Sequence, residues 1–109
     1  MFVRVYAIDD GTQVSLEEPD DCGRFHLVCE IDVELLGAAL VEANVGSLRD
    51  AETALINPEA IVRAAGGRVG ADWGERFGAM IEFAESKGWM TDDGNVRAHV
   101  QAGGASWSG

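Results

Sequence analysis

The sequence predicts an α+β fold, a two-layer sandwich in which three or four helices pack on one face of a mostly antiparallel sheet. Two observations carry this prediction. Strand-like segments lie near both ends of the chain, at residues 2–8, 12–16, 24–31 and 96–101. Apolar residues at helical spacing fill the middle, between residues 33 and 87. Terminal strands that flank a helical middle are typical of a sheet covered by helices on one side.

The N-terminal strands are predicted from alternation and turn residues. Residues 2–8 are rich in β-branched and aromatic side chains, and Asp9-Asp10-Gly11 then marks a turn into residues 12–16, so we expect a hairpin. In residues 24–31 apolar and polar side chains alternate most clearly. We expect one side of that strand to face the core, with Phe25, Leu27, Cys29 and Ile31 on it.

The helices are predicted from capping residues and apolar stripes. Asp32 is a suitable N-cap for a helix over 33–43, and Asn57-Pro58 opens a second one that ends at Gly66-Gly67. A third helix follows an apolar stripe that begins at Trp73 and ends before Gly88. Between the first two, Ser47-Leu48-Arg49-Asp50 resembles a capping box, which predicts one or two helical turns to about residue 56.

A second hairpin is expected from residues 89–91 and 96–101, joined by Asp92-Asp93-Gly94-Asn95. With 109 residues, the chain is long enough for one core. We therefore expect a single α+β domain over 1–101. The remaining 102–109 form a Gly/Ser-rich stretch that we expect to be a flexible tail, in which Trp107 has no predicted role.

The charge of the chain limits its partners. The 19 acidic residues outnumber the 8 Lys and Arg residues, for a net charge of −11. Nucleic acids and anionic membranes are bound through clustered cations, so neither is an expected partner. There is no apolar segment of membrane-spanning length and no signal peptide pattern, so we expect a cytoplasmic protein. Its two cysteines, Cys22 and Cys29, are then expected to be reduced, a disulfide between them being the alternative.

One face of the predicted sheet gathers the side chains that could carry function. If helices cover one side, strand parity places the other residues together on the opposite side. That side carries both histidines, the only tyrosine and several arginines of an otherwise acidic chain. Its members are Phe2, Arg4, Tyr6, Ile8, Arg24, His26, Val28, Glu30, Arg97, His99 and Gln101.

Three interpretations of this face remain open. It can be an ordinary solvated sheet face, since antiparallel sheets often leave one side wet. It can be an interface, with Tyr6 and the arginines as anchors, because Tyr and Arg are enriched at contact cores. It can also be a small-molecule pocket in which His26 and His99 act as acid–base groups and Arg4 or Arg97 holds a carboxylate.

A metal site is not expected. Cys22, His26 and Cys29 resemble a ligand cluster, but His26 and Cys29 lie three apart on a strand and so point to opposite faces. His26 and His99 alone are too few ligands for a site. No phosphate-binding loop, zinc-protease motif or nucleophile elbow occurs, so no cofactor is expected.

The sequence therefore predicts a small binding module without catalysis, whose partner is another protein or a second copy of the chain. The residues expected to bind a partner or ligand are Arg4, Arg24, Glu30, Arg97 and Gln101. The alternative is a small cofactor-independent enzyme, an isomerase, lyase or hydrolase, with His26, His99 and Tyr6 as its catalytic residues and a small molecule as its ligand. An enzyme needs a concavity of about 300 Å³ or more, whereas a binding module needs only a flat patch.

Overall fold

The N-terminal hairpin forms where alternation predicts it. In the computed structural model, which describes residues 1–102, β1 (Phe2–Ile8) pairs antiparallel with β2 (Gly11–Glu17). The register sets Val3 opposite Leu16 and Val5 opposite Val14, so the apolar residues of both strands share one face. This face is the one that the core covers.

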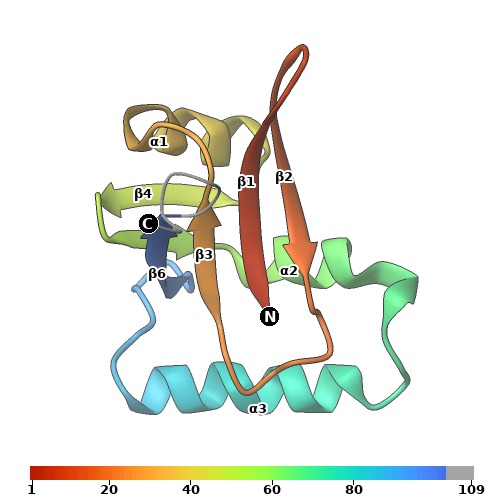
Figure 1. Ribbon diagram of the computed structural model, residues 1–109. Coiled ribbons are helices and arrows are strands. Elements are labelled where there is room, and N and C mark those ends of the chain that lie inside the picture. The colour runs from red at the N-terminus through yellow and green to blue at the C-terminus, as the bar shows by residue number, and fades with distance from the viewer. Residues whose placement is uncertain (103–109) are drawn as a thin grey trace.

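Over residues 1–102 the sheet is mixed and has six strands in the order β2-β1-β3-β6-β5-β4. Its remaining members are β3 (His26–Cys29), β4 (Gly46–Asp50), β5 (Thr53–Ile56) and β6 (Val96–Ala102). β3 lies parallel to both of its neighbours, β1 and β6, whereas the three outer pairings are antiparallel. The sheet curls, so that β4 runs crosswise behind β3 (Figure 1).

In the part of the chain that the structure describes, three helices and one short 3-10 turn complete the fold. They are α1 (Val33–Glu42), α2 (Pro58–Ala65), η1 (Gly66–Arg68) and α3 (Trp73–Ser86). The expected caps are present: the Asp32 carboxylate accepts from the Glu34 backbone N–H, and the Asn57 side chain from that of Glu59. None of the helices in residues 1–102 combines the length and apolarity required to cross a bilayer.

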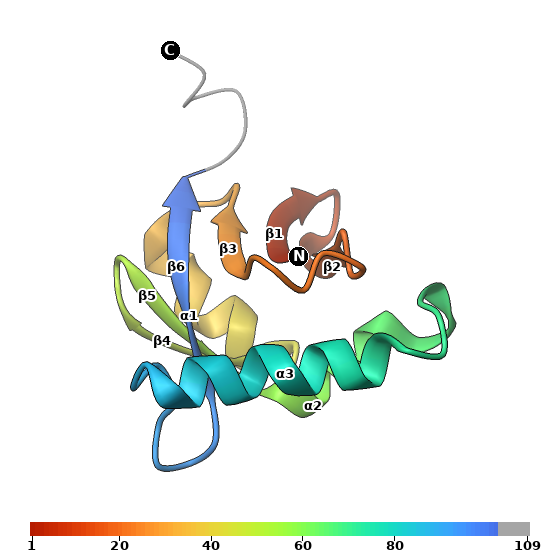
Figure 2. The ribbon, with the colours of Figure 1, turned by 90° about the horizontal axis from the view of Figure 1, so that it is seen from below.

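The α+β class is confirmed, but the two-layer, mostly antiparallel sandwich is not the architecture of this chain. The helices close the openings of a curled sheet instead of lying side by side on a flat one. Figure 2 shows α3 running along one end of the sheet, with α2 beside it and α1 at the back. A parallel centre arises because β1, β3 and β6 are joined by long connections that return each strand in the same direction.

The helical turns predicted for residues 47–56 are wrong, because this segment is the β4–β5 hairpin. Its geometry depends on Gly46, where an added Cβ would lie 2.0 Å from the Leu55 carbonyl oxygen. Leu48 points toward α1, within 3.5 Å of where a Gly37 Cβ would be. The capping-box pattern is therefore overridden by tertiary packing.

The second predicted hairpin is confirmed in part. Residues 89–91 form no named strand, but they pair antiparallel with the start of β6 through a bridge between Met90 and Val96, and the Arg97 backbone N–H donates to the Trp89 carbonyl oxygen at 2.9 Å. β6 inserts between β3 and β5 and takes its main pairings from them. The tail predicted over 102–109 lies outside the described residues, apart from Ala102, which ends β6.

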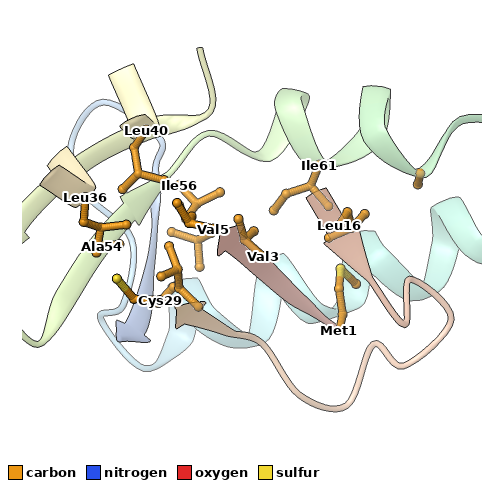
Figure 3. Packing of buried hydrophobic residues seen from close by; sticks show 14 of the residues in the cluster. Met1, Val3, Val5, Leu16, Cys29, Leu36, Leu40, Ala54, Ile56 and Ile61 are labelled. Atoms are coloured by element: carbon orange, nitrogen blue, oxygen red, sulfur yellow. The ribbon is translucent and has the colours of Figure 1, made fainter. Parts of the chain in front are cut away.

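The core fills the concave side of the curled sheet. Figure 3 shows Val3 and Val5 of β1 facing Ile56 of β5, with Leu36 and Leu40 of α1 closing one end. Alternation in the strands and helical spacing in the helices together predict nine residues of one core. Six of the nine are buried, and the other three pack partly buried against the same cluster. The six are Leu27, Cys29, Leu36, Leu40, Trp73 and Phe77; the others are Ile31, Ile81 and Val100.

Candidate functional site

The convex side of the sheet carries most of the predicted site residues. We call it the outer face, and it consists of the outward side chains of β1, β3 and β6. No described helix passes in front of β1 and β3 in Figure 1. Its members are Phe2, Arg4, Tyr6, His26, Val28, His99 and Gln101, to which Glu30 adds its side chain just beyond β3.

The two histidines lie side by side on the outer face. His26 and His99 are register partners in the parallel pairing of β3 and β6. Strand parity predicts that they share a face, whereas the pairing itself is a finding of the structure. On its other side, His26 pairs with Phe2, and the two rings stack with centroids 5.1 Å apart and planes 18° from parallel. Thr53 of β5 continues the row beyond His99.

Burial lowers the pKa of His26 below its ordinary value. The positive charges of the N-terminal ammonium and Arg24 lower this pKa further, while Glu18 acts in the opposite direction. His26 is therefore an uncharged imidazole at neutral pH and can accept a proton.

A second group on the outer face centres on Arg4. Its Nε donates to the Glu30 Oε2 at 2.5 Å and its Nη2 to Oε1 at 3.2 Å, a two-pronged contact. The guanidinium carbon also lies 4.1 Å from the centre of the Tyr6 ring. The hydrogen bond with Glu30 raises the pKa of Arg4, and the same contact lowers the pKa of Glu30. Arg4 is thus held in place from two sides.

Two predicted residues lie elsewhere or at the margin of this face. Arg24 is not on the outer face, because β3 begins at His26 and strand parity does not extend back to residue 24. It is exposed at the end of the sheet and lines a cleft. Arg97 lies where that cleft meets the outer face, and its backbone pairs with Leu55.

The concavity beside the histidines is shallow and lies on the His99 side only. A groove of about 310 Å³ is lined by Phe25, Thr53, Trp89, Arg97, Ala98 and His99. The residues that line it do not include His26 or Tyr6. The three predicted catalytic residues are therefore not gathered in one pocket of the described chain.

A larger cleft lies at the end of the sheet, which we call the α3 cleft. It encloses about 450 Å³ between α3, the segment before β3 and the start of β6. Its lining residues are Cys22, Gly23, Arg24, Phe25, Arg76, Ala79, Met80, Phe83, Ala84, Trp89, Val96 and Arg97. Sequence reasoning missed this site. The available signal was a pair of aromatic residues outside the core stripe, Phe83 and Trp89, which are 55% and 45% exposed.

Among the described residues, neither the cysteines nor the residue types that bind metals are gathered into a site. Cys22 and Cys29 are both free thiols, and Cys29 is buried with its Sγ 3.1 Å from the Ile31 carbonyl oxygen. Burial raises the pKa of the Cys22 thiol, so it is predominantly protonated at neutral pH. Within residues 1–102, no three His, Cys, Asp or Glu side chains are grouped closely enough to hold a metal ion.

The arrangement offers three chemical capacities: a half-buried aromatic and polar surface, a proton-accepting imidazole, and a cationic aromatic cleft. Comparisons with family models, curated proteins and solved structures find no match to this chain.

Proposed function

We propose that the chain is a binding module without catalysis, and that its outer face associates with the outer face of a second copy. The observation that carries this proposal is the charge of that face. Arg4 and Glu30 are the members of this face whose side chains carry a full charge at neutral pH, and they form an ion pair. The face is therefore neutral when its histidines are uncharged, whereas the chain as a whole has a net charge of −11.

This neutrality favours a second copy as the partner. Two chains of charge −11 repel each other in most orientations, and the repulsion is smallest when neutral faces meet. A symmetric contact also needs a surface that complements itself. The outer face carries both members of an Arg–Glu pair, together with the partly exposed rings of Phe2 and Tyr6 and the side chain of Val28. Aromatic and arginine side chains are the residue types enriched at contact cores.

Sedimentation velocity over a range of protein and salt concentrations tests this proposal. We expect self-association that strengthens from low to moderate salt, because salt screens the repulsion between the two acidic chains. An association driven by Arg–acid contacts with a different, acidic protein would weaken with salt instead. A chain that stays monomeric at millimolar concentration and moderate salt would contradict the proposal.

A matched pair of variants locates the contact. Val28→Glu adds one negative charge at the middle of the outer face, between Arg4 and Gln101 in the register. Val41→Glu adds the same charge on α1, where the side chain is 62% exposed. We expect Val28→Glu to abolish self-association and Val41→Glu to leave it nearly unchanged. Equal effects of the two substitutions would mean that the outer face is not the contact.

The compartment that suits this module is the cytoplasm. Both cysteines of the described chain are free thiols, which fits a reducing environment.

A second candidate function is a cofactor-independent enzyme that uses His26 as a base and His99 as its partner. It is favoured by the register pairing of the two histidines and by the lowered pKa of His26. Hydrolysis of 4-nitrophenyl acetate is a simple probe of this chemistry. An enzyme would exceed the rate given by two equivalents of free imidazole and lose that excess in a His26→Gln/His99→Gln variant. A rate no greater than that of free imidazole would contradict this second candidate for ester hydrolysis.

A further inference from the structure

The α3 cleft combines two properties that a solvated crevice does not need. Its walls are largely apolar, and they include Phe25, Met80, Phe83 and Trp89. Phe83 and Trp89 are about half exposed and meet edge to face, with ring centroids 5.8 Å apart. Large exposed aromatic residues gathered at one concave place are typical of binding sites.

The charge of the cleft is opposite to that of the chain. Arg24, Arg76 and Arg97 line it, and no Asp or Glu is among its lining residues, although the chain has 19 acids. Lys87 adds a cation near the rim, with its Nζ 5.4 Å from the centre of the Phe83 ring. The cleft is therefore a local positive region on an acidic protein.

The three arginines are not equivalent. Arg76 is already neutralised, because its guanidinium lies 3.6 Å from the Asp20 carboxylate and 3.5 Å from that of Asp72. It also donates to the Asp20 carbonyl oxygen at 2.9 Å, which ties α3 to the segment that forms the opposite wall. Within residues 1–102, the side chains of Arg24 and Arg97 form neither an ion pair nor a hydrogen bond. These two guanidinium groups are available to a ligand.

We propose that the α3 cleft binds a small organic monoanion, a carboxylate carried on a flat aromatic body. The planar guanidinium of Arg24 or Arg97 can grip a carboxylate with two parallel hydrogen bonds. The aromatic body would lie against Phe25, Phe83 and Trp89. This ligand class is a property of the cleft alone and does not depend on association through the outer face.

Size and charge exclude the larger alternatives. A volume of about 450 Å³ is that of a small-molecule site. The surrounding charge of −11 repels a polyanion such as a nucleic acid or a strongly acidic peptide, because only a few cations at the cleft oppose it. A single carboxylate gains the local attraction of the arginines with the least repulsion from the remaining surface.

Titration with 2-naphthoate, followed by calorimetry and by amide chemical shifts, tests the proposal. We expect saturable binding, with the largest shifts at Phe25, Phe83 and Trp89. The matched neutral probe is 2-naphthamide, which keeps the aromatic body and lacks the charge. We expect it to bind at least tenfold more weakly, because a charge-assisted hydrogen bond contributes more than a neutral one.

Variants separate a specific site from general affinity of the protein for aromatic compounds. Arg97→Gln and Arg24→Gln should each weaken 2-naphthoate binding. We expect the variant with the larger effect to lose about tenfold or more in affinity. Arg63→Gln on α2 changes the net charge equally at an exposed position outside the cleft and should leave binding within about twofold. Phe83→Ser should weaken both probes, because it removes an aromatic wall that each of them contacts.

Three outcomes would overturn the proposal. The first is equal affinity for the two probes, which would mean that the arginines contribute nothing. The second is an equal loss of affinity in the Arg97→Gln and Arg63→Gln variants, which would mean that only the net charge matters. The third is the absence of saturable binding of 2-naphthoate to the unsubstituted chain up to millimolar concentrations. The amide spectra of the variants show whether each of them is folded.

Discussion

Arg4 and Glu30, 26 positions apart in the sequence, form a two-pronged ion pair between the middle of β1 and the residue that follows β3. The Glu30 backbone also donates to the Val5 carbonyl oxygen at 2.8 Å, which continues the parallel pairing of the two strands. The ion pair therefore joins two strands whose association no local sequence signal specifies.

Because of this ion pair, the free energy of unfolding depends on pH in the acidic range. The hydrogen bond from Arg4 lowers the pKa of Glu30 in the folded chain. The resulting stabilisation is present above the ordinary Glu pKa of about 4.3 and is lost as the pH falls through the lower, folded value. We expect Glu30→Gln to destabilise the chain at neutral pH and to lose this effect in acid, as measured by urea unfolding. Glu82→Gln, an exposed change on α3, should show no such pH dependence.

His26 gives a second and separate pH dependence. Burial is the main cause of its lowered pKa, so its protonation is harder in the folded chain than in the unfolded one. Above the ordinary His pKa of about 6.5, His26 is mainly neutral in both the folded and the unfolded chain, so it contributes little to the pH dependence of the unfolding free energy. As the pH falls from there to the pKa of His26 in the folded chain, the unfolding free energy decreases. We expect His26→Gln to reduce the slope of unfolding free energy against pH in this range. An imidazole signal of His26 that titrates above 6.5 by NMR would contradict this prediction.

The stacked pair of Trp73 and Phe77 anchors α3 to the core. Phe77 is 6% exposed, and its ring lies 4.8 Å from that of Trp73, centroid to centroid. We expect Phe77→Ala to cost about 3–5 kcal/mol of unfolding free energy, because it leaves a cavity beneath the helix. Phe83→Ala on the same helix removes a ring that is 55% exposed and should cost less than about 1 kcal/mol. Similar losses for the two variants in denaturant unfolding would show that Phe77 is not a core anchor.

Two glycines should respond to alanine in opposite ways. At Gly46 the new Cβ would lie 2.0 Å from the Leu55 carbonyl oxygen of the paired strand, so the β4–β5 hairpin would have to separate. We expect a loss of about 3 kcal/mol or more. At Gly78, inside α3, nothing lies within 4 Å of the added atom, and the helix should gain about 0.5–1 kcal/mol. Thermal unfolding of the two variants measures both effects.

The elements that sequence predicted correctly are those with a strong local signal. Asp32 and Asn57 cap helices as expected, and the stripe from Trp73 to Phe77 faces the core. The turn at residues 9–11 joins two paired strands. In each case a few adjacent residues contain the whole signal.

What sequence could not predict depends on partners far along the chain. Alternation indicates which side of a strand is buried but not which strand lies beside it, so the parallel centre of the sheet was not foreseen. Leu48 and Gly46 are placed by contacts with Gly37 and Leu55, and these contacts override a local helix signal. The outer face was foreseen because strand parity alone defines it. The α3 cleft was not, since it depends on where α3 crosses the end of the sheet.

The position of β6 has a consequence for how the chain folds during its synthesis. β6 lies between β3 and β5, and among the described strands it alone joins β2-β1-β3 to β5-β4. A nascent chain that emerges from the ribosome therefore holds two half-sheets with open inner edges until residues 96–102 are free to insert. During that interval, the inner edges of β3 and β5 are exposed to strands of neighbouring nascent chains. Insertion of β6 is thus the step that covers both inner edges.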